Sequence, residues 1–177
     1  TTSQLLADLF ANGGELTLGE NVEISAPLTT TTSNKIVLDG NGKSITYTGT
    51  DRAIQITQGN VEIKNLTINM PENTPESSRG INLYNGVTSA AIDVTLNNVT
   101  VNGYKAYAVN IGGGSNNKLT IKNSTLTGYA AINVNVAPEN HTIVVDGCVL
   151  NGKNHNNNYH FGTVVIDGTN KHSLAIT

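Results

Sequence analysis

The chain has 177 residues, of which 37% are hydrophobic and 13% are charged, and its formal net charge is −3. This length is sufficient for one domain with a hydrophobic core. Only two arginines occur, Arg52 and Arg79. The sequence therefore has no basic stripe to neutralise phosphates, and no nucleic-acid binding is expected. No apolar run approaches the roughly 18 residues of a membrane span, so no membrane insertion is expected either.

Residues 1–14 are predicted to form an N-terminal capping helix. The helix is expected to start after Ser3, a suitable N-cap, and to end near Asn12, where Gly13–Gly14 provide a left-handed exit. Apolar residues recur at helical spacing at Leu5, Leu6, Leu9 and Phe10. We expect this helix to cover one end of the domain, because an uncovered end exposes apolar core and unpaired backbone.

Five short segments of the remaining chain follow one template, an alternating strand that ends in Asn or Gly. Their starts lie 25, 33, 25 and 24 residues apart. A period in that range is typical of a solenoid, in which each turn packs against the next. We expect positive φ at each terminal Asn or Gly, because these residues adopt it with least strain. The segments are Ile36–Gly40, Val61–Asn65, Val94–Asn98, Leu119–Asn123 and Ile143–Gly147.

Each repeat contains two further strands. The second strand follows the bend at once, as in Leu66–Ile68, Val99–Val101, Ser124–Leu126 and Cys148–Leu150. The third is predicted at Ala53–Ile56, Gly80–Leu83, Ala108–Ile111, Ala131–Val134 and Thr163–Ile166. Repeats of this length with three strands leave no room for helices, and like elements stacked in order form parallel sheets. We therefore predict an all-β fold, a three-strand-per-turn parallel solenoid of about six turns that forms one domain over residues 15–177.

This layout resembles the right-handed parallel β-helix of the pectate-lyase-like superfamily over about residues 14–177. The resemblance rests on the form of the repeats. The superfamily includes polysaccharide lyases, polygalacturonase-type hydrolases, phage tailspikes and many noncatalytic surface proteins, so the resemblance alone does not select a function. The chain contains no Asn-Thr-Asp, Asp-Asp, His-Gly or Arg-Ile-Lys segment of the polygalacturonase type. An enzyme is therefore the less favoured interpretation.

Two repeats are longer than the others, and each carries its extra residues before its third strand, at residues 70–79 and 151–160. Insertions at one repeat position emerge on one edge of a solenoid. We expect these loops to be walls about 14 Å apart, three turns along the axis, with room for a short oligosaccharide between them. The floor is expected to include an outward amide ladder of Gln55, Asn82, Asn110 and Asn133.

The candidate ligand-binding residues come from these loops, the corner between them and the floor. They are Arg79, Asn82, Tyr104, Lys105, Tyr107, Asn110, Tyr129, Asn133, His155, Tyr159 and His160. Each type also has a structural explanation, because amide ladders bond to one another and corner tyrosines often cover core edges. The absence of Trp and the presence of only two Phe favour that structural explanation.

No catalytic residue, cofactor or metal site is predicted. Asp39 and Asp146 occupy matching strand positions about four turns, or ~19 Å, apart. Paired-acid hydrolysis needs carboxylates roughly 6.5–9.5 Å apart. His155 and His160 lie in one loop without an acidic or third ligand, which is weak support for a metal. Cys148 is the only cysteine, so no intramolecular disulfide is expected, and its repeat position indicates a small buried side chain.

The sequence predicts a noncatalytic bacterial module for surface display, adhesion or glycan contact, with an oligo- or polysaccharide as partner. Its abundant Asn, Thr and Gly are typical of secreted surface proteins, so an extracellular or cell-surface location is expected. The alternative is a polysaccharide lyase or glycoside hydrolase acting on an acidic polysaccharide. Asp51 with Arg52 and Glu76 with Arg79 share one corner, where surface ion pairs are favoured over an acid/base group.

The last segment, Leu174–Thr177, restarts the strand template and then stops. An uncovered strand edge is a template for association. We therefore expect the solenoid to continue beyond this segment or to associate end to end through it.

Overall fold

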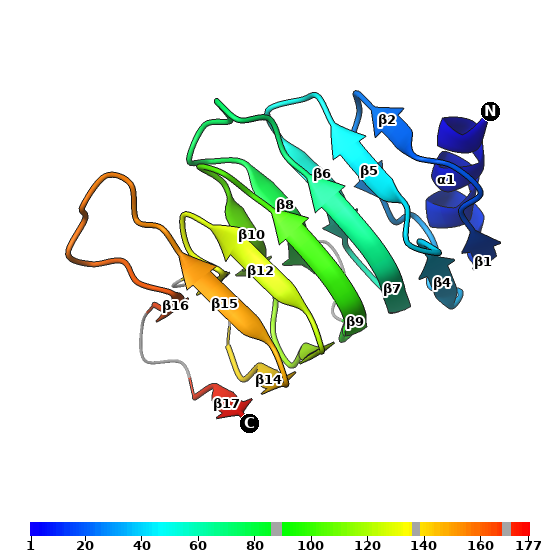
Figure 1. Ribbon diagram of the computed structural model, residues 1–177. Coiled ribbons are helices and arrows are strands. Elements are labelled where there is room, and N and C mark those ends of the chain that lie inside the picture. The colour runs from blue at the N-terminus through cyan, green and yellow to red at the C-terminus, as the bar shows by residue number, and fades with distance from the viewer. Residues whose placement is uncertain (86–89, 136–138, 168–170) are drawn as a thin grey trace.

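The computed structural model is an all-β parallel solenoid of about five turns, with a short helix at its N-terminal end (Figure 1). The structure describes residues 1–85, 90–135, 139–167 and 171–177. The predicted fold class is confirmed, although the number of turns is slightly smaller than the expected six. The first and last turns are the least regular, since β3 (Leu28–Thr29) has two residues and β17 (Ser173–Ile176) begins a further turn at the C-terminal end.

Helix α1 (Thr2–Asn12) covers the first turn of the solenoid. Its N-cap is Thr1 and not the expected Ser3, because the Thr1 side chain accepts a hydrogen bond from the backbone N–H of Gln4 at 3.2 Å. Gly13 ends the helix with a φ of 82°, and its N–H donates to the Leu9 carbonyl oxygen at 2.8 Å. The apolar face of the helix is buried at Leu6, Leu9 and Phe10.

The first sheet contains 11 strands in two arms that meet at a bend. One arm consists of β1 (Gly14–Thr17), β4 (Ile36–Asp39), the first half of β7 (Asn60–Asn69), the first half of β9 (Asp93–Asn102), β11 (Lys118–Lys122), β14 (Thr142–Asp146) and β17. The other consists of β2 (Val22–Ile24), β5 (Ser44–Tyr47), the second halves of β7 and β9, β12 (Thr125–Gly128) and β15 (Val149–Gly152). The pairs along both arms are parallel, as predicted.

The bend follows the predicted backbone conformation at all but one turn. Positive φ of 50° to 64° occurs at Asn65, Asn98, Asn123 and Gly147. The prediction was wrong for Gly40, because the two extra residues of that turn, Asn41 and Gly42, take the positive φ instead, at 51° and 76°. Gly40 is required for a different reason: a Cβ there would collide with the carbonyl oxygen of Asn65 in the next turn.

The second sheet carries the third strand of every turn, in the order β16 (Val164–Ile166), β13 (Ile132–Val134), β10 (Tyr107–Gly113), β8 (Arg79–Tyr84), β6 (Arg52–Ile56) and β3. Its inward side chains stack in register and belong to the main hydrophobic core. Ile54, Ile81, Val109 and Ile132 form one such column and have no exposed area. Each buried side chain of this kind stabilises the fold by roughly 1.5–3 kcal/mol relative to exposure.

Both long loops leave the solenoid at the corner between the second and third strands, as predicted. One joins β7 to β8, and the other joins β15 to β16.

Cys148 lies half-buried before β15, where it packs against the core. Strand β17 lies at the end opposite α1, and its Leu174 and Ile176 side chains are 37% and 55% exposed. Within the described ranges, no helix is long and apolar enough to cross a membrane.

Candidate functional site

The two long loops contact each other and close the corner between them. The Asn156 side-chain Nδ2 donates a hydrogen bond of 2.7 Å to Glu76 Oε2. The expected separation of about 14 Å between two loop walls is therefore wrong. A stretch of ten residues has an extended length of about 33 Å. Because both ends of loop 151–160 are fixed, it reaches out about half of that length, or ~16 Å, which is enough to cross the intervening turns.

An aromatic cluster fills the space beneath these loops. The Phe161 ring stacks on Tyr107 at 5.8 Å between centroids, and it meets Tyr129 edge-on at 5.0 Å. The His155 ring lies edge-on to Tyr129 at 4.8 Å. Tyr107 is 7% exposed and Tyr129 is fully buried, so neither ring offers a surface to a ligand in this conformation. The structural explanation is thus the better one for these two tyrosines.

Arg79 fastens the first loop to this cluster. Its guanidinium carbon lies 4.1 Å from the centre of the Tyr107 ring, a cation–π geometry. The Arg79 Nη1 donates 2.9 Å hydrogen bonds to the backbone oxygens of Glu76 and Ser78. The expected ion pair with the Glu76 carboxylate is replaced by these backbone bonds. Burial lowers the pKa of Arg79 to about 10, so the guanidinium is still charged at neutral pH.

The other predicted loop and corner residues are exposed. Tyr104 and Lys105 lie in the turn before β10, where Tyr104 is 43% exposed and has a φ of 52°. Tyr159 and His160 lie in the second loop, with their ring centres 4.0 Å apart, and Tyr159 is 89% exposed. The structure thus brings Arg79, Tyr107, Tyr129 and His155 into contact in one cluster, in which the two tyrosines are covered and His155 stays exposed. It leaves Tyr104, Lys105, Tyr159 and His160 on the surface.

The predicted amide ladder runs along the outer face of the second sheet. Asn82 Nδ2 donates to Gln55 Oε1 at 2.8 Å, Asn110 Nδ2 to Asn82 Oδ1 at 2.7 Å, and Asn133 Nδ2 to Asn110 Oδ1 at 2.7 Å. The three asparagines are only 1% to 5% exposed. Because these buried amides satisfy one another, the ladder acts mainly as a rigid structural element.

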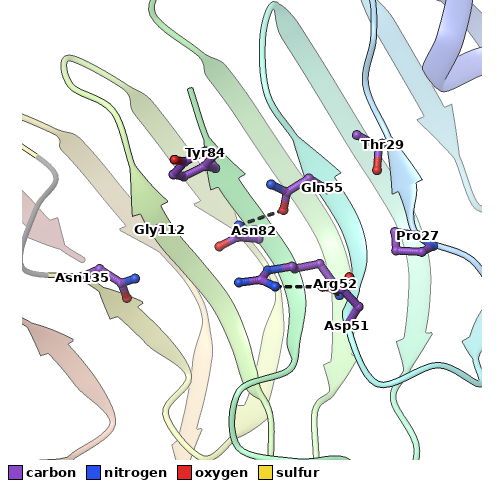
Figure 2. A pocket seen from close by; sticks show the side chains of 9 residues that line it. All are labelled: Pro27, Thr29, Asp51, Arg52, Gln55, Asn82, Tyr84, Gly112 and Asn135. Carbon is purple, nitrogen blue, oxygen red and sulfur yellow. Dashed lines mark hydrogen bonds and ion pairs between the residues drawn. The ribbon is translucent and has the colours of Figure 1, made fainter. Parts of the chain in front are cut away.

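A depression of about 380 Å³ lies on this same face (Figure 2). It reaches from the first turn, through the ladder, to the residue that follows β13. Its lining consists of Pro27, Thr29, Asp51, Arg52, Gln55, Asn82, Tyr84, Gly112 and Asn135. Among the candidate ligand-binding residues predicted from the sequence, only Asn82 lines it. The most informative residue missed is Tyr84, which follows Asn82 by two positions and therefore lies on the same side of the strand.

Tyr84 is the exposed aromatic side chain of the depression. It is paired in register with Gly113 of β10, beside an irregularity in the pairing between Ile111 and Gly113. A Cβ at Gly113 would collide with the Tyr84 ring, so the ring rests against glycine backbone. Tyr84 is 40% exposed, which leaves part of its ring available for contact from solvent.

Asp51 and Arg52 form an ion pair at the opposite end of the same strands. Arg52 Nη1 lies 2.8 Å from Asp51 Oδ1, and the two side chains are 41% and 57% exposed, respectively. The predicted surface ion pair between these residues is thus confirmed. The hydrogen bond from Arg52 lowers the pKa of Asp51, so this carboxyl is ionised at neutral pH and is a poor proton donor.

The depression lacks the elements of paired-acid chemistry, because Asp51 is the one carboxylate among its lining residues. In the part of the chain that the structure describes, no group of three or more His, Cys, Asp or Glu side chains is arranged to hold a metal ion. The arrangement therefore offers hydrogen bonding and one aromatic surface for binding. Comparison with known protein families, curated proteins and solved structures gave no match to this chain.

Proposed function

We propose that this chain is a noncatalytic extracellular or cell-surface module that contacts glycans through the outer face of β6, β8 and β10. The depression beside Tyr84 is the observation that carries this proposal. It combines a partly exposed aromatic ring with a charged pair over the rigid floor of the amide ladder. Ligand sites in proteins commonly combine a concave apolar surface with a few polar groups that fix orientation.

The lining residues suit both the apolar C–H groups and the hydroxyl groups of a sugar. The exposed part of the Tyr84 ring provides an apolar surface for the C–H groups of a sugar. The ionised Asp51 carboxylate accepts hydrogen bonds from hydroxyl groups, and the remaining N–H groups of Arg52 donate to them. The ion pair leaves this end of the depression with little net charge, which favours hydroxyl-rich ligands over strongly anionic ones.

Membership in the right-handed, pectate-lyase-like group of parallel β-helices is part of this proposal, and the three parallel strands per turn support it. A hydrolase or lyase role has less support, because the depression has a single, ion-paired carboxylate. Incubation with uronate polymers tests this directly. Absorbance from unsaturated products, or a rise in reducing ends, would contradict the noncatalytic assignment.

A glycan array tests the binding proposal, with the wild-type protein compared with Tyr84→Ala and Tyr104→Asn. The two tyrosines are similarly exposed, at 40% and 43%, but only Tyr84 lines the depression. Asn suits the positive φ at position 104, so this control variant is expected to fold. We expect Tyr84→Ala to weaken glycan affinity about tenfold, equivalent to 1.4 kcal/mol, and Tyr104→Asn to leave it unchanged. The reverse result would place the contact at the loop corner, and no signal with the wild type would refute glycan contact.

Surface display and end-to-end association are further parts of the proposal. The exposed Leu174 and Ile176 of β17 support association at the C-terminal end of the solenoid. Light scattering over a concentration series should show a dimer that Ile176→Lys dissociates into monomers, whereas a concentration-independent monomer would refute association.

Antibody labelling of intact, unpermeabilised source cells tests the surface location, and labelling only after permeabilisation would refute it.

A further inference from the structure

A column of polar side chains lies inside the corner where each turn passes from the second sheet back to the first. Asn117, His141 and His172 directly precede β11, β14 and β17. Each accepts a hydrogen bond from the backbone of the turn before it. Ile92 N–H donates to Asn117 Oδ1 at 2.9 Å, Asn117 N–H to His141 Nδ1 at 3.1 Å, and His141 N–H to His172 Nδ1 at 3.0 Å. The column therefore joins each turn to the next through side-chain acceptors.

The last strand, β17, and the histidine that precedes it shield His141 from solvent on one side. The ring of His172 stacks on that of His141, parallel to within 2° and with centroids 5.1 Å apart. Ser173 N–H donates to the carbonyl oxygen of His141 at 2.8 Å, where β17 begins to pair with β14 in parallel register. With this shield in place, His141 is 1% exposed.

Protonation of His141 is unfavourable while β17 shields it. The Nδ1 atom faces the backbone N–H of Asn117, so a proton added there would replace the acceptor with a second donor. The Nε2 atom is buried and has no hydrogen-bond partner among the described residues, so the charged ring would gain no solvation on that side. Burial and the adjacent His172 accordingly lower the pKa of His141 to about 4.

The charged groups near this corner have little effect on that balance. Those within two residues of a member of the column are Lys118, Glu139 and Lys171, and all three side chains are exposed. Water weakens the field of charges at such positions. The charge that acts on His141 is that of His172, which belongs to the shield itself. Departure of β17 therefore removes both causes of the low pKa of His141, the burial and the neighbouring ring.

Strand β17 is weakly held. It lies at the C-terminal end of the first sheet and pairs with β14 on one side only (Figure 1). Its Leu174 and Ile176 side chains are 37% and 55% exposed, whereas their register partners Ile143 and Val145 are each 1% exposed. Segments with few buried apolar contacts open at low free-energy cost. Departure of β17 therefore requires no unfolding of the preceding turns.

We propose that β17 is released from β14 in mild acid, when the His141 ring that it shields takes up a proton. In the released state the ring turns out of the corner, and both of its nitrogens donate hydrogen bonds to water. The edge of β14, with Ile143 and Val145, is then open to pairing with another strand. The release does not depend on glycan contact, because the column shares no residue with the sheet-face depression.

Hydrogen exchange of the intact protein at pH 7 and pH 5.5 tests the release, with exchange times scaled to the intrinsic rate at each pH. The pKa of His141 rises from about 4 to about 6.5 when the ring is uncovered, so opening of β17 should become about tenfold more favourable at pH 5.5. We expect this increase in the exchange of residues 173–177. Exchange there that does not increase would overturn the proposal.

Low concentrations of urea distinguish local release from unfolding of the whole chain. Release of β17 exposes little surface, so exchange of residues 173–177 should depend only weakly on urea. Exchange through global unfolding depends strongly on urea, and such a dependence at residues 173–177 would overturn the proposal.

His141→Asn is the matched variant, because Asn117 shows that an asparagine at this position accepts the same backbone N–H. We expect most of the difference in exchange between the two pH values to be lost in His141→Asn. The difference should be kept in His160→Asn, which replaces an exposed histidine. An unchanged difference in His141→Asn would show that another group drives the release and would overturn the proposal.

Discussion

Asn156 and Glu76, which are 80 residues apart in the chain, are joined by a 2.7 Å hydrogen bond between the tips of the two long loops. The bond crosses the corner in which Tyr107, Tyr129 and Phe161 pack together. It therefore converts two insertions into one cover over a second, smaller hydrophobic cluster. Access to that cluster depends on whether the cover opens, and this can be measured.

Asn156→Ala should loosen the cover without unfolding the solenoid. The substitution removes one exposed, charge-assisted hydrogen bond, worth about 1 kcal/mol. We expect faster amide hydrogen exchange in residues 153–163 and little change in the melting temperature. Glu76→Gln is the matched control, because a Gln carbonyl still accepts from Asn156. Equal exchange in wild type and Asn156→Ala would show that the aromatic cluster alone holds the loop.

Gly113→Ala should displace Tyr84 and distort the sheet-face depression. The added methyl group would occupy the position of the Tyr84 ring, so the ring must move outward or the strand must shift. Overpacking of this kind costs about 1–3 kcal/mol. Chemical denaturation measures the stability loss, and Tyr84 fluorescence quenching by iodide, read as a difference from wild type, reports greater exposure of the ring. Gly162→Ala is the control, since no atom lies within 4 Å of a Cβ at that position.

The strands and the edge on which the loops emerge were predictable from the sequence because they repeat. Alternating apolar residues and a terminal Asn such as Asn65 recur every turn, and the packing of successive turns requires that recurrence. The features that do not repeat were missed. Loop lengths indicate where a loop begins but not its path, so the Asn156–Glu76 contact was not foreseen, and Tyr129 was a candidate for ligand binding as well as for covering the core edge, where it lies. The exposure of Tyr84 likewise depends on a local register shift in its neighbour strand.

Asn110→Ala should destabilise the amide ladder from its middle. Its side chain accepts from Asn133 and donates to Asn82, so truncation leaves Asn82 Oδ1 and one of the two N–H groups of Asn133 Nδ2 unpartnered, while the other N–H group still donates to Asn135 Oδ1 at 2.9 Å. The expected loss in the free energy of unfolding is about 2–4 kcal/mol, at one to two per buried group. Gln55→Ala at the end of the ladder leaves one buried group, Asn82 Nδ2, without its acceptor and should cost about 1–2 kcal/mol, less than Asn110→Ala. Urea denaturation of both variants tests this order, and no measurable loss in Asn110→Ala would show that the ladder adds little to stability.

The buried His141 makes the fold sensitive to mild acid. Burial, together with the adjacent His172, lowers the pKa of His141 from 6.5 to about 4 in the folded chain. Between these values the unfolded chain binds the proton and the folded chain does not, so protonation favours unfolding as the pH falls. The loss by pH 4 is on the order of 3 kcal/mol. The pKa values of Asp39 and Asp51 are lowered from 3.8 in the folded chain, so these carboxylates stabilise the fold above that pH. Their stabilisation is lost at lower pH than that of the neutral His141, and the two effects can therefore be measured separately.

His141→Asn identifies the source of this acid sensitivity. Asn occupies the same corner position one turn earlier, at Asn117, where its Oδ1 accepts the equivalent backbone N–H. The variant therefore keeps an acceptor at this position and removes the titrating group. Urea denaturation at pH 7 and pH 4.5 should show a smaller pH-dependent loss of stability in His141→Asn than in the wild type. His160→Asn, at an exposed position, should behave like the wild type, and an undiminished pH dependence in His141→Asn would exclude His141 as its cause.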